Sequence, residues 1–164
     1  MIKKKNIAIV GGGVFGTTIA WKLSEAGNAV DLFEKNDDIF KCASGINQYR
    51  IHKGYHYPRS VETVLSCIEG EKKFSNIYGG AVLKNNRHYY CISKNDSLTS
   101  NIEFEKLCND NGLDLKISTP DIINKESILE SYEVNESLFD PIKLKKIIKE
   151  KLEKHKVNIN LNRE

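Results

Sequence analysis

The feature that most constrains the fold is a glycine-rich turn near the amino terminus, VGGGVFG at residues 10–16. The apolar run before it, Asn6 to Val10, predicts a short strand that is buried on both faces of a parallel sheet. The stretch after it, Val14 to Ala26, predicts a helix that ends at Gly27 with a left-handed cap. The expected buried face of this helix consists of Ile19, Ala20 and Leu23. The turn therefore joins a predicted strand directly to a predicted helix.

Three glycines of this turn have the spacing GxGxxG. Gly11 permits a tight turn out of the strand, and Gly13 lets the backbone approach a pyrophosphate. Gly16 lets the new helix pack closely on the sheet. The amino terminus of that helix directs its positive dipole and its N–H groups at phosphates. The spacing and its context together predict a dinucleotide site.

A carboxylate follows the second predicted strand. Ala29 to Phe33 read as that strand, and Glu34 lies about 20 residues beyond the glycines, where it can accept hydrogen bonds from the adenosine ribose hydroxyls. Its charge would repel a 2′-phosphate, which disfavours NADP. The residues expected to bind the cofactor here are Gly11, Gly13, Val14, Phe15, Gly16, Glu34 and Lys35. FAD and NAD share the ADP moiety, so these residues leave both open, and a glycine turn without a ligand is the alternative.

Two stretches resemble a known family. Gly11, Gly13, Gly16, Ala20, Leu23, Gly27, Val30 and Glu34 are similar to the extended flavoprotein pattern of the D-amino-acid oxidase and glycine oxidase superfamily. A further stretch resembles L-2-hydroxyglutarate dehydrogenase-like members at Ser44, Asn47, Ile51, His52, Gly54, Tyr57 and Pro58. In relatives this stretch lies along the flavin ring and helps to form the substrate pocket. The resemblance implies FAD rather than NAD, and it adds Ser44 and Asn47 to the expected cofactor residues.

The same stretch contains the candidate catalytic residues. NQYRIHKGYHYPR, residues 47–59, is dense in polar, cationic and aromatic side chains. Arg50 could pair bidentately with a carboxylate, and an imidazole such as that of His52 exchanges protons near neutral pH. A half-buried surface loop is the alternative from the residues alone, whereas the resemblance favours a flavin and substrate lining. No general base is assigned, because in this class a hydride can pass directly from the substrate carbon to the flavin.

The remaining elements predict an inserted segment and a return to the first sheet. Ser60 caps a helix, Ala81–Lys84 and Arg87–Ser93 form a hairpin around Asn85 and Asn86, and Ser100 with Glu103 forms a capping box. Asp140 and Pro141 then open a helix whose expected buried residues are Ile142, Ile147, Ile148 and Leu152, and a strand with Val157, Ile159 and Leu161 follows. The predicted fold is α/β, with a Rossmann-like FAD-binding βαβ domain at residues 1–54 and 139–164. An α+β substrate segment occupies residues 55–138.

Composition excludes several other classes. The net charge of +3 is small, and Lys3 to Lys5 lack interleaved aromatic residues, so they predict a solvated tail rather than a nucleic-acid site. The four cysteines are scattered without a CxxC pair, which predicts no metal site and reduced thiols in a cytoplasmic protein. Glycines interrupt the first apolar run, which disfavours a signal peptide, and no run predicts a transmembrane segment.

The chain of 164 residues is short for this superfamily, in which the relatives continue well beyond the last predicted strand. It is therefore expected to be the amino-terminal part of a longer enzyme, half of a split enzyme that a second chain completes, or a degenerate product. The expected function is an FAD-dependent oxidoreductase that acts on a small amino or hydroxy acid. The alternatives are a non-catalytic FAD- or ADP-binding module and an NAD-dependent dehydrogenase.

Overall fold

A computed structural model describes residues 4–84 and 86–163 and divides the chain into two compact units. The first unit comprises Met1–Tyr49 and Asp140–Glu164, and the second comprises Arg50–Phe139. Residues 50–54, which the sequence assigned to the first domain, belong to the second unit because the strand that begins at Arg50 pairs there. Lys3 and Asn85, which were expected in a tail and a turn, lie outside the described residues.

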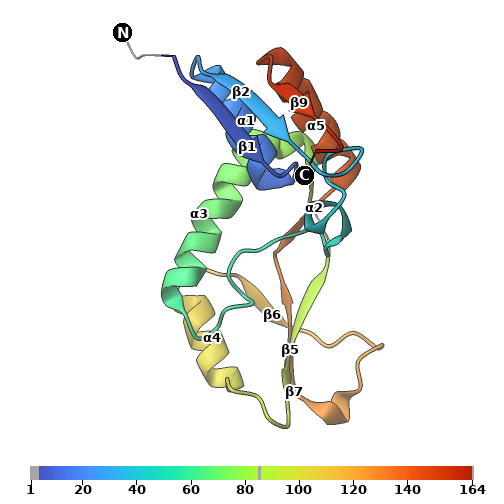
Figure 1. The fold of residues 1–164 in the computed structure, drawn as a ribbon. Coiled ribbons are helices and arrows are strands. Elements are labelled where there is room, and N and C mark those ends of the chain that lie inside the picture. Colours follow the sequence, from blue (N-terminus) through green and yellow to red (C-terminus); the bar gives the residue numbers. More distant parts are fainter. Residues whose placement is uncertain (1–3, 85, 164) are drawn as a thin grey trace. The chain divides into compact units, whose positions relative to one another are not determined.

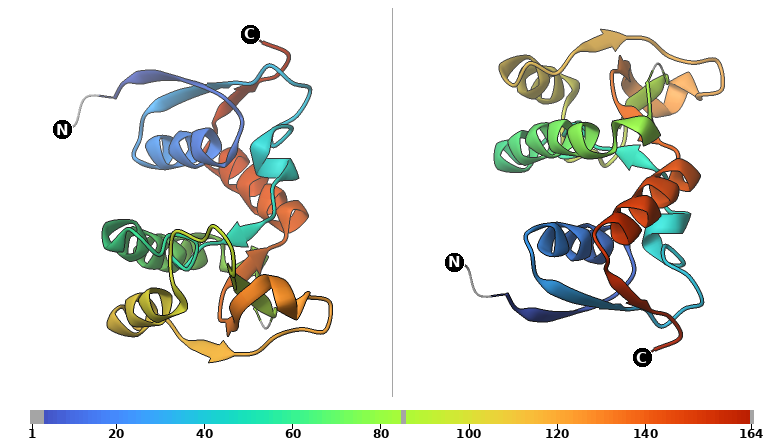
Figure 2. Two further views of the ribbon diagram at one scale, coloured as in Figure 1. Left: turned by 90° about the horizontal axis from the view of Figure 1, so that it is seen from below. Right: turned by 90° about the horizontal axis from the view of Figure 1, so that it is seen from above.

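The first unit is a parallel three-stranded sheet of order β1-β2-β9. The helices α1 and α5 lie on the same side of this sheet (Figures 1 and 2). Its elements are β1 (Asn6–Val10), α1 (Val14–Glu25), β2 (Ala29–Phe33), α2 (Ala43–Ile46), α5 (Pro141–Lys154) and β9 (Asn158–Asn160). The parallel β1-α1-β2 crossover and the returning helix and strand confirm the predicted Rossmann-like arrangement.

The expectation that β1 is buried on both faces is wrong. Its residues alternate between exposed and half-buried, and the side chain of Val10 is 85% exposed. In the described part of the chain β1 pairs only with β2, so its other edge has no neighbouring strand. Apolar composition predicted the strand, whereas its burial depends on what packs against it.

The buried faces of the two helices differ in part from the expected ones. In α1 the buried residues are Thr17, Ala20 and Trp21, while Ile19 is exposed. In α5 the buried residues are Leu144, Ile148 and Leu152, while Ile142 in the first turn is exposed. Ala20, Ile148 and Leu152 are buried as predicted, whereas the contacts with the rest of the unit decide which further positions are covered. The caps by Asp140 and Pro141 are confirmed.

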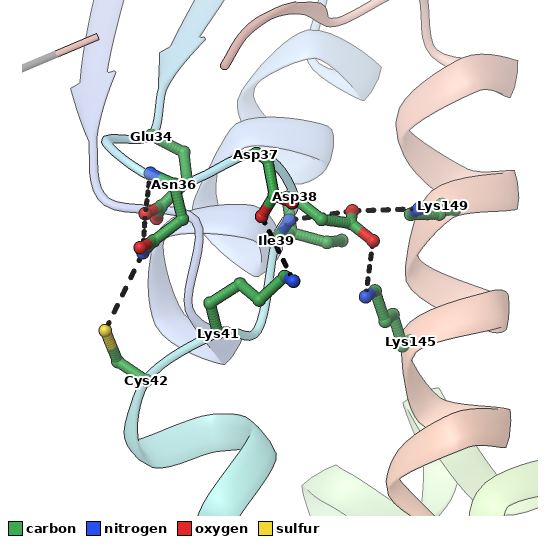
Figure 3. Close-up of polar contacts among 9 residues, drawn as sticks. All are labelled: Glu34, Asn36, Asp37, Asp38, Ile39, Lys41, Cys42, Lys145 and Lys149. Carbon is green, nitrogen blue, oxygen red and sulfur yellow. Dashed lines mark hydrogen bonds and ion pairs between the residues drawn. The ribbon is translucent and has the colours of Figure 1, made fainter. Parts of the chain in front are cut away.

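An ion-pair cluster joins α5 to the loop that follows β2 (Figure 3). Lys145 Nζ lies 2.5 Å and Lys149 Nζ 2.9 Å from the carboxylate oxygens of Asp38. Burial of Asp38 by itself raises its pKa, but the hydrogen bonds from the two ammonium groups outweigh this effect and lower the pKa from 3.8 to about 2. The neighbouring Asp37 contacts only the exposed Lys41 among the residues shown, at 3.1 Å.

We expect the stabilisation by Asp38 to depend on pH. Because its folded pKa is lowered, the ion pairs stabilise the chain above pH 3.8, and the effect is lost as the pH falls towards about 2. Asp38→Asn should therefore cost about 1–2 kcal/mol near neutral pH and much less near pH ~2, measured by urea unfolding. The exposed control Asp37→Asn should cost less than about 0.5 kcal/mol at both values. An Asp38→Asn cost that does not change with pH would contradict the assignment.

The second unit combines two antiparallel sheets with the helices α3 and α4 (Figure 1). Its elements are β3 (Arg50–Ile51), α3 (Val61–Tyr78), η1 (Gly79–Ala81), β4 (Val82–Leu83), β5 (His88–Ser93), α4 (Asn101–Asp110), β6 (Leu115–Ile117), η2 (Lys125–Ser127), β7 (Ile128–Val134) and β8 (Ser137–Phe139). Tyr55, Val64, Phe104 and Tyr132 lie in its buried core. None of the described helices, including the 18-residue α3, is long and apolar enough to cross a membrane.

The two helix caps predicted for this unit are confirmed, whereas one strand pairing is wrong. Ser60 caps α3, and Ser100 forms the reciprocal capping box with Glu103. The expected hairpin between residues 81–84 and 87–93 does not form, because β4 pairs with β8 and β5 pairs with β7. The caps depend on neighbours three residues away, whereas the strand partners lie far along the chain.

Candidate functional site

The glycine turn after β1 has the geometry that its spacing predicts. Gly11 has a φ of +106°, and its N–H donates to the carbonyl oxygen of Phe33 at 2.8 Å. A Cβ atom at Gly16 would overlap the carbonyl oxygen of Gly11 and would also contact the side chain of Ile9. The turn and the first turn of α1 therefore pack so closely that Gly16 cannot carry a side chain without displacing backbone.

The middle glycine, Gly12, has a role that the spacing did not reveal. Its N–H donates to Oε2 of Glu34 at 2.6 Å. A Cβ atom at Gly12 would lie 2.8 Å from the same oxygen. The three consecutive glycines were the available signal, because a turn that needs only Gly11 and Gly13 would tolerate a side chain between them.

The carboxylate of Glu34 is buried and held from two sides. Its Oε1 accepts hydrogen bonds from the backbone N–H of Asn36 at 2.9 Å and from Asn36 Nδ2 at 2.6 Å (Figure 3). Burial alone would raise the pKa of Glu34, but the hydrogen bonds from Asn36 and Gly12 lower it below its usual value. Glu34 is therefore charged at neutral pH, and its orientation is set before any ligand binds. Asn36 is not among the residues that the sequence predicted for this site.

A cavity of about 450 Å³ opens at the carboxyl ends of β1 and β2. It is lined by Val10, Gly11, Gly12, Gly13, Phe33, Glu34, Lys35, Cys42 and Arg163. Four of the expected cofactor residues thus meet in one cavity, and Cys42 and Arg163 join them from outside the motif. A cavity with one fixed carboxylate, two cationic side chains and a close-packed glycine backbone fits the ADP moiety of a dinucleotide.

The other expected cofactor residues lie in different places. Ser44 Oγ accepts a hydrogen bond from the N–H of Val14 at 2.9 Å, so both lie at the amino terminus of α1. Phe15 is exposed and does not line the cavity. Asn47 is also exposed, and its Oδ1 accepts the N–H of Tyr49 at 2.7 Å in a local turn. The structure therefore brings Ser44 to the glycine turn but gives Asn47 a partner in its own loop.

The candidate catalytic residue Arg50 lies in the second unit and is paired with a buried carboxylate. Its Nε lies 3.0 Å from Oε2 of Glu136, and its Nη2 contacts the same oxygen. Nη2 also lies 2.5 Å from the hydroxyl of Tyr90. The side chain of Glu136 is 0% exposed and that of Arg50 is 19% exposed. The expectation that Arg50 binds a ligand carboxylate is therefore disfavoured, because its fork already engages Glu136.

The second candidate, His52, borders the same carboxylate. Its Nδ1 lies 3.5 Å from Oε1 of Glu136. The imidazole stacks on His56, with ring centroids 5.8 Å apart, and meets the edge of Tyr57 at 6.2 Å. Burial, followed by the charge of Arg50, lowers the pKa of His88 in the same unit. Nothing in the sequence pattern singled out Glu136, because it lies between β7 and β8 and is brought to the segment of His52 by the pairing of β8 with β3.

Comparisons with known proteins agree with this geometry. The family model for FAD-dependent oxidoreductases, DAO, matches residues 6–143. The FAD-dependent monooxygenase kojA of Aspergillus flavus is 32% identical over 162 residues, which cover 95% of this chain and 38% of that protein. L-alpha-glycerophosphate oxidase from Mycoplasma pneumoniae, solved with FAD bound, has a TM-score of 0.74 at 21% identity and covers 98% of this chain and 45% of its own.

A second solved structure, glycine oxidase from Bacillus cereus, has a TM-score of 0.73 at 18% identity and covers 98% of this chain and 46% of its own. At these identities the two structures show a shared fold. The chain spans less than half the length of each of these relatives. The match to the family model confirms the expected resemblance and the expectation of FAD, and it removes the NAD-dependent alternative. The chain belongs to the DAO family of FAD-dependent oxidoreductases.

Proposed function

We propose that this chain binds FAD through its first unit and is part of an enzyme that oxidises a small amino or hydroxy acid. The observation that carries the proposal is the pre-set Glu34 carboxylate beside the glycine turn, in a cavity with Lys35 and Arg163. Membership of the family supports FAD as the ligand of this cavity. The substrate class is supported by the polar stretch around His52 and by the resemblance of that stretch to enzymes of hydroxy acids.

The residues of the first unit would hold the cofactor at its ADP end. Oε2 of Glu34 accepts one hydrogen bond, from Gly12, and retains a lone pair for a ribose hydroxyl. The first N–H groups of α1 have no acceptor within the helix. That of Val14 donates to Ser44, and those that follow it would be available to the phosphate oxygens of the cofactor. Ser44 accepts the N–H of Val14 and so fixes this end of the helix.

The chemistry of the reaction comes from the cofactor. When bound, FAD supplies the acceptor for the hydride that leaves the substrate carbon. We assign His52, whose side chain is 36% exposed, to the substrate lining, and Arg50 to holding that lining in place through Glu136. These side chains would align the substrate.

A second reaction type is favoured by one observation. The curated relative kojA carries the name of a monooxygenase, so insertion of an oxygen atom into the substrate is the alternative to simple oxidation. Product analysis separates monooxygenation from simple oxidation, because only a monooxygenase transfers an atom from labelled O₂ to the organic product. A non-catalytic FAD-binding module is the other alternative.

The absorption spectrum of the purified chain, with FAD and NAD titrated in parallel, tests the proposed cofactor. A bound flavin spectrum with no NAD binding is expected. A folded chain that binds NAD and not FAD would overturn the proposal.

Glu34→Ala should weaken FAD binding about tenfold to hundredfold, because it removes a hydrogen bond to a charged group. Flavin fluorescence titration measures the affinity. Asp37→Ala, three residues further along the same loop, removes an exposed carboxylate and should leave the affinity unchanged. Equal affinities for wild type and Glu34→Ala would argue against the ribose contact.

A further inference from the structure

We propose that Glu136 is a positioning residue for His52. Oε1 of Glu136 orients the imidazole of His52 so that Nδ1–H points towards this oxygen. Nε2, at the opposite edge of the ring, is then left as a hydrogen-bond acceptor. One part of the proposal rests on the proposed function: the group that Nε2 accepts a hydrogen bond from is an O–H or N–H of a small substrate. The orientation itself is a property of this chain.

Glu136 is suited to hold a neighbour because it cannot itself move freely. Its side chain is completely buried, and both of its oxygens are engaged. Arg50 contacts Oε2 through Nε and Nη2, and the hydroxyl of Tyr90 lies 3.3 Å from the same oxygen. The backbone N–H of Lys53 donates to Oε1 at 2.9 Å. Two strands and the loop after β3 thus fix the carboxylate that faces His52.

The buried edge of His52 determines its tautomer. Nδ1 is buried and forms no hydrogen bond of good geometry with any residue that the structure describes. Oε1 of Glu136 lies 3.5 Å away, and a carboxylate only accepts. A buried ring nitrogen beside a carboxylate oxygen is stabilised as a donor, so neutral His52 carries its proton on Nδ1. The exposed part of the side chain is then the edge with Nε2.

The surroundings of this edge are compatible with proton exchange. The groups that face His52 are the rings of His56 and Tyr57 and the carboxylate of Glu136. The same carboxylate also accepts hydrogen bonds from Arg50 and Tyr90. If a substrate hydroxyl or ammonium loses its proton, the O–H or N–H bond breaks and an Nε2–H bond forms. The positive charge then lies beside Glu136, as in other triads in which a carboxylate orients a histidine.

The tautomer can be measured directly on this chain. Long-range ¹H–¹⁵N spectra at a pH where imidazoles are neutral distinguish Nδ1–H from Nε2–H, and His52→Gln identifies the signals of His52. We expect mainly Nδ1–H in the wild type. In Glu136→Gln the amide oxygen can face either Arg50 or the N–H of Lys53, and the charged Arg50 with its two donors should attract it more strongly than that single N–H does. The amide N–H₂ should then face Nδ1, which should shift His52 to mainly Nε2–H.

Glu133→Gln is the matched control, because it removes a carboxylate from β7, three residues before Glu136, that has no contact to His52 in the described structure. It should leave the tautomer unchanged. A wild-type His52 that is mainly Nε2–H would overturn the proposal, and this result needs no variant to fold. An unchanged Nδ1–H signal in a folded Glu136→Gln would overturn it equally. A merely structural role of Glu136 would not produce the tautomer exchange.

The outcome is separate from that of the proposed function, because the spectra need no FAD. Flavin binding together with an unchanged tautomer in Glu136→Gln would retain the proposed function and reject the positioning role. The expected tautomer exchange in a chain that binds no flavin would retain the positioning role and reject the proposed function.

Discussion

Replacing Gly16 by Ala is expected to destabilise the first unit by about 1–3 kcal/mol and to lower the affinity for FAD by about tenfold to hundredfold. The added Cβ would overlap the carbonyl oxygen of Gly11, which is backbone and cannot rotate away. The glycine turn would then have to move relative to α1, and the phosphate-facing N–H groups would move with it. Urea unfolding and flavin titration measure the two effects.

Gly70→Ala is the matched control for this substitution. Gly70 lies within α3, and a Cβ there would meet no heavy atom within 4 Å. The change should stabilise the second unit by about 0.5–1 kcal/mol, because alanine favours the helix, and it should leave the FAD affinity unchanged. If Gly16→Ala retained both wild-type stability and wild-type affinity, the close packing of the turn on α1 would be refuted.

Replacing Glu136 by Ala is expected to destabilise the second unit by about 3–5 kcal/mol. The substitution leaves the guanidinium of Arg50, which is largely buried, without its carboxylate. It also removes the acceptor for the N–H of Lys53. Breaking a buried pair from one side is costly because the remaining charge is no longer compensated. Urea unfolding, followed by the signals of the second unit, measures the loss.

Removing both charges should cost much less than removing one. A variant with Arg50→Met and Glu136→Met should recover most of the stability lost in Glu136→Ala, because no buried charge remains. Glu133→Ala, three residues earlier in β7, should cost less than about 1 kcal/mol. A loss of less than about 1 kcal/mol in Glu136→Ala would show that the pair does not hold the segment of Arg50 and Lys53.

Much of the candidate site could be predicted from the sequence where the interactions are local. The turn with Gly11 and Gly16 and the acid at the end of β2 follow from a motif whose spacing encodes its own geometry. The partners of the acid were not predictable in the same way. Gly12 contacts Glu34 across 22 residues, and Cys42 and Arg163 reach the cavity from separate segments.

The candidate substrate lining was identified only in outline. The composition of residues 47–59 indicated a functional stretch, but it suggested that Arg50 was free to bind a ligand. Glu136 lies 86 residues away from Arg50 and pairs with it because β3 and β8 are neighbours in one sheet. A motif within residues 47–59 contains no information about the Glu136 carboxylate, which lies beside Arg50 only because distant strands pair.

The sequence by itself determined the elements of the βαβ unit and the starts of three later helices. The caps by Ser60, Ser100 and Asp140 and the glycine turn depend on neighbours a few residues away, and the helices and strands of the first unit depend on hydrophobic period. Only the tertiary structure decided which strand pairs with which, how far β1 is buried, and that Arg50 and His52 share the Glu136 carboxylate. The physical reason is that packing and desolvation depend on contacts between distant segments, which local propensity does not specify.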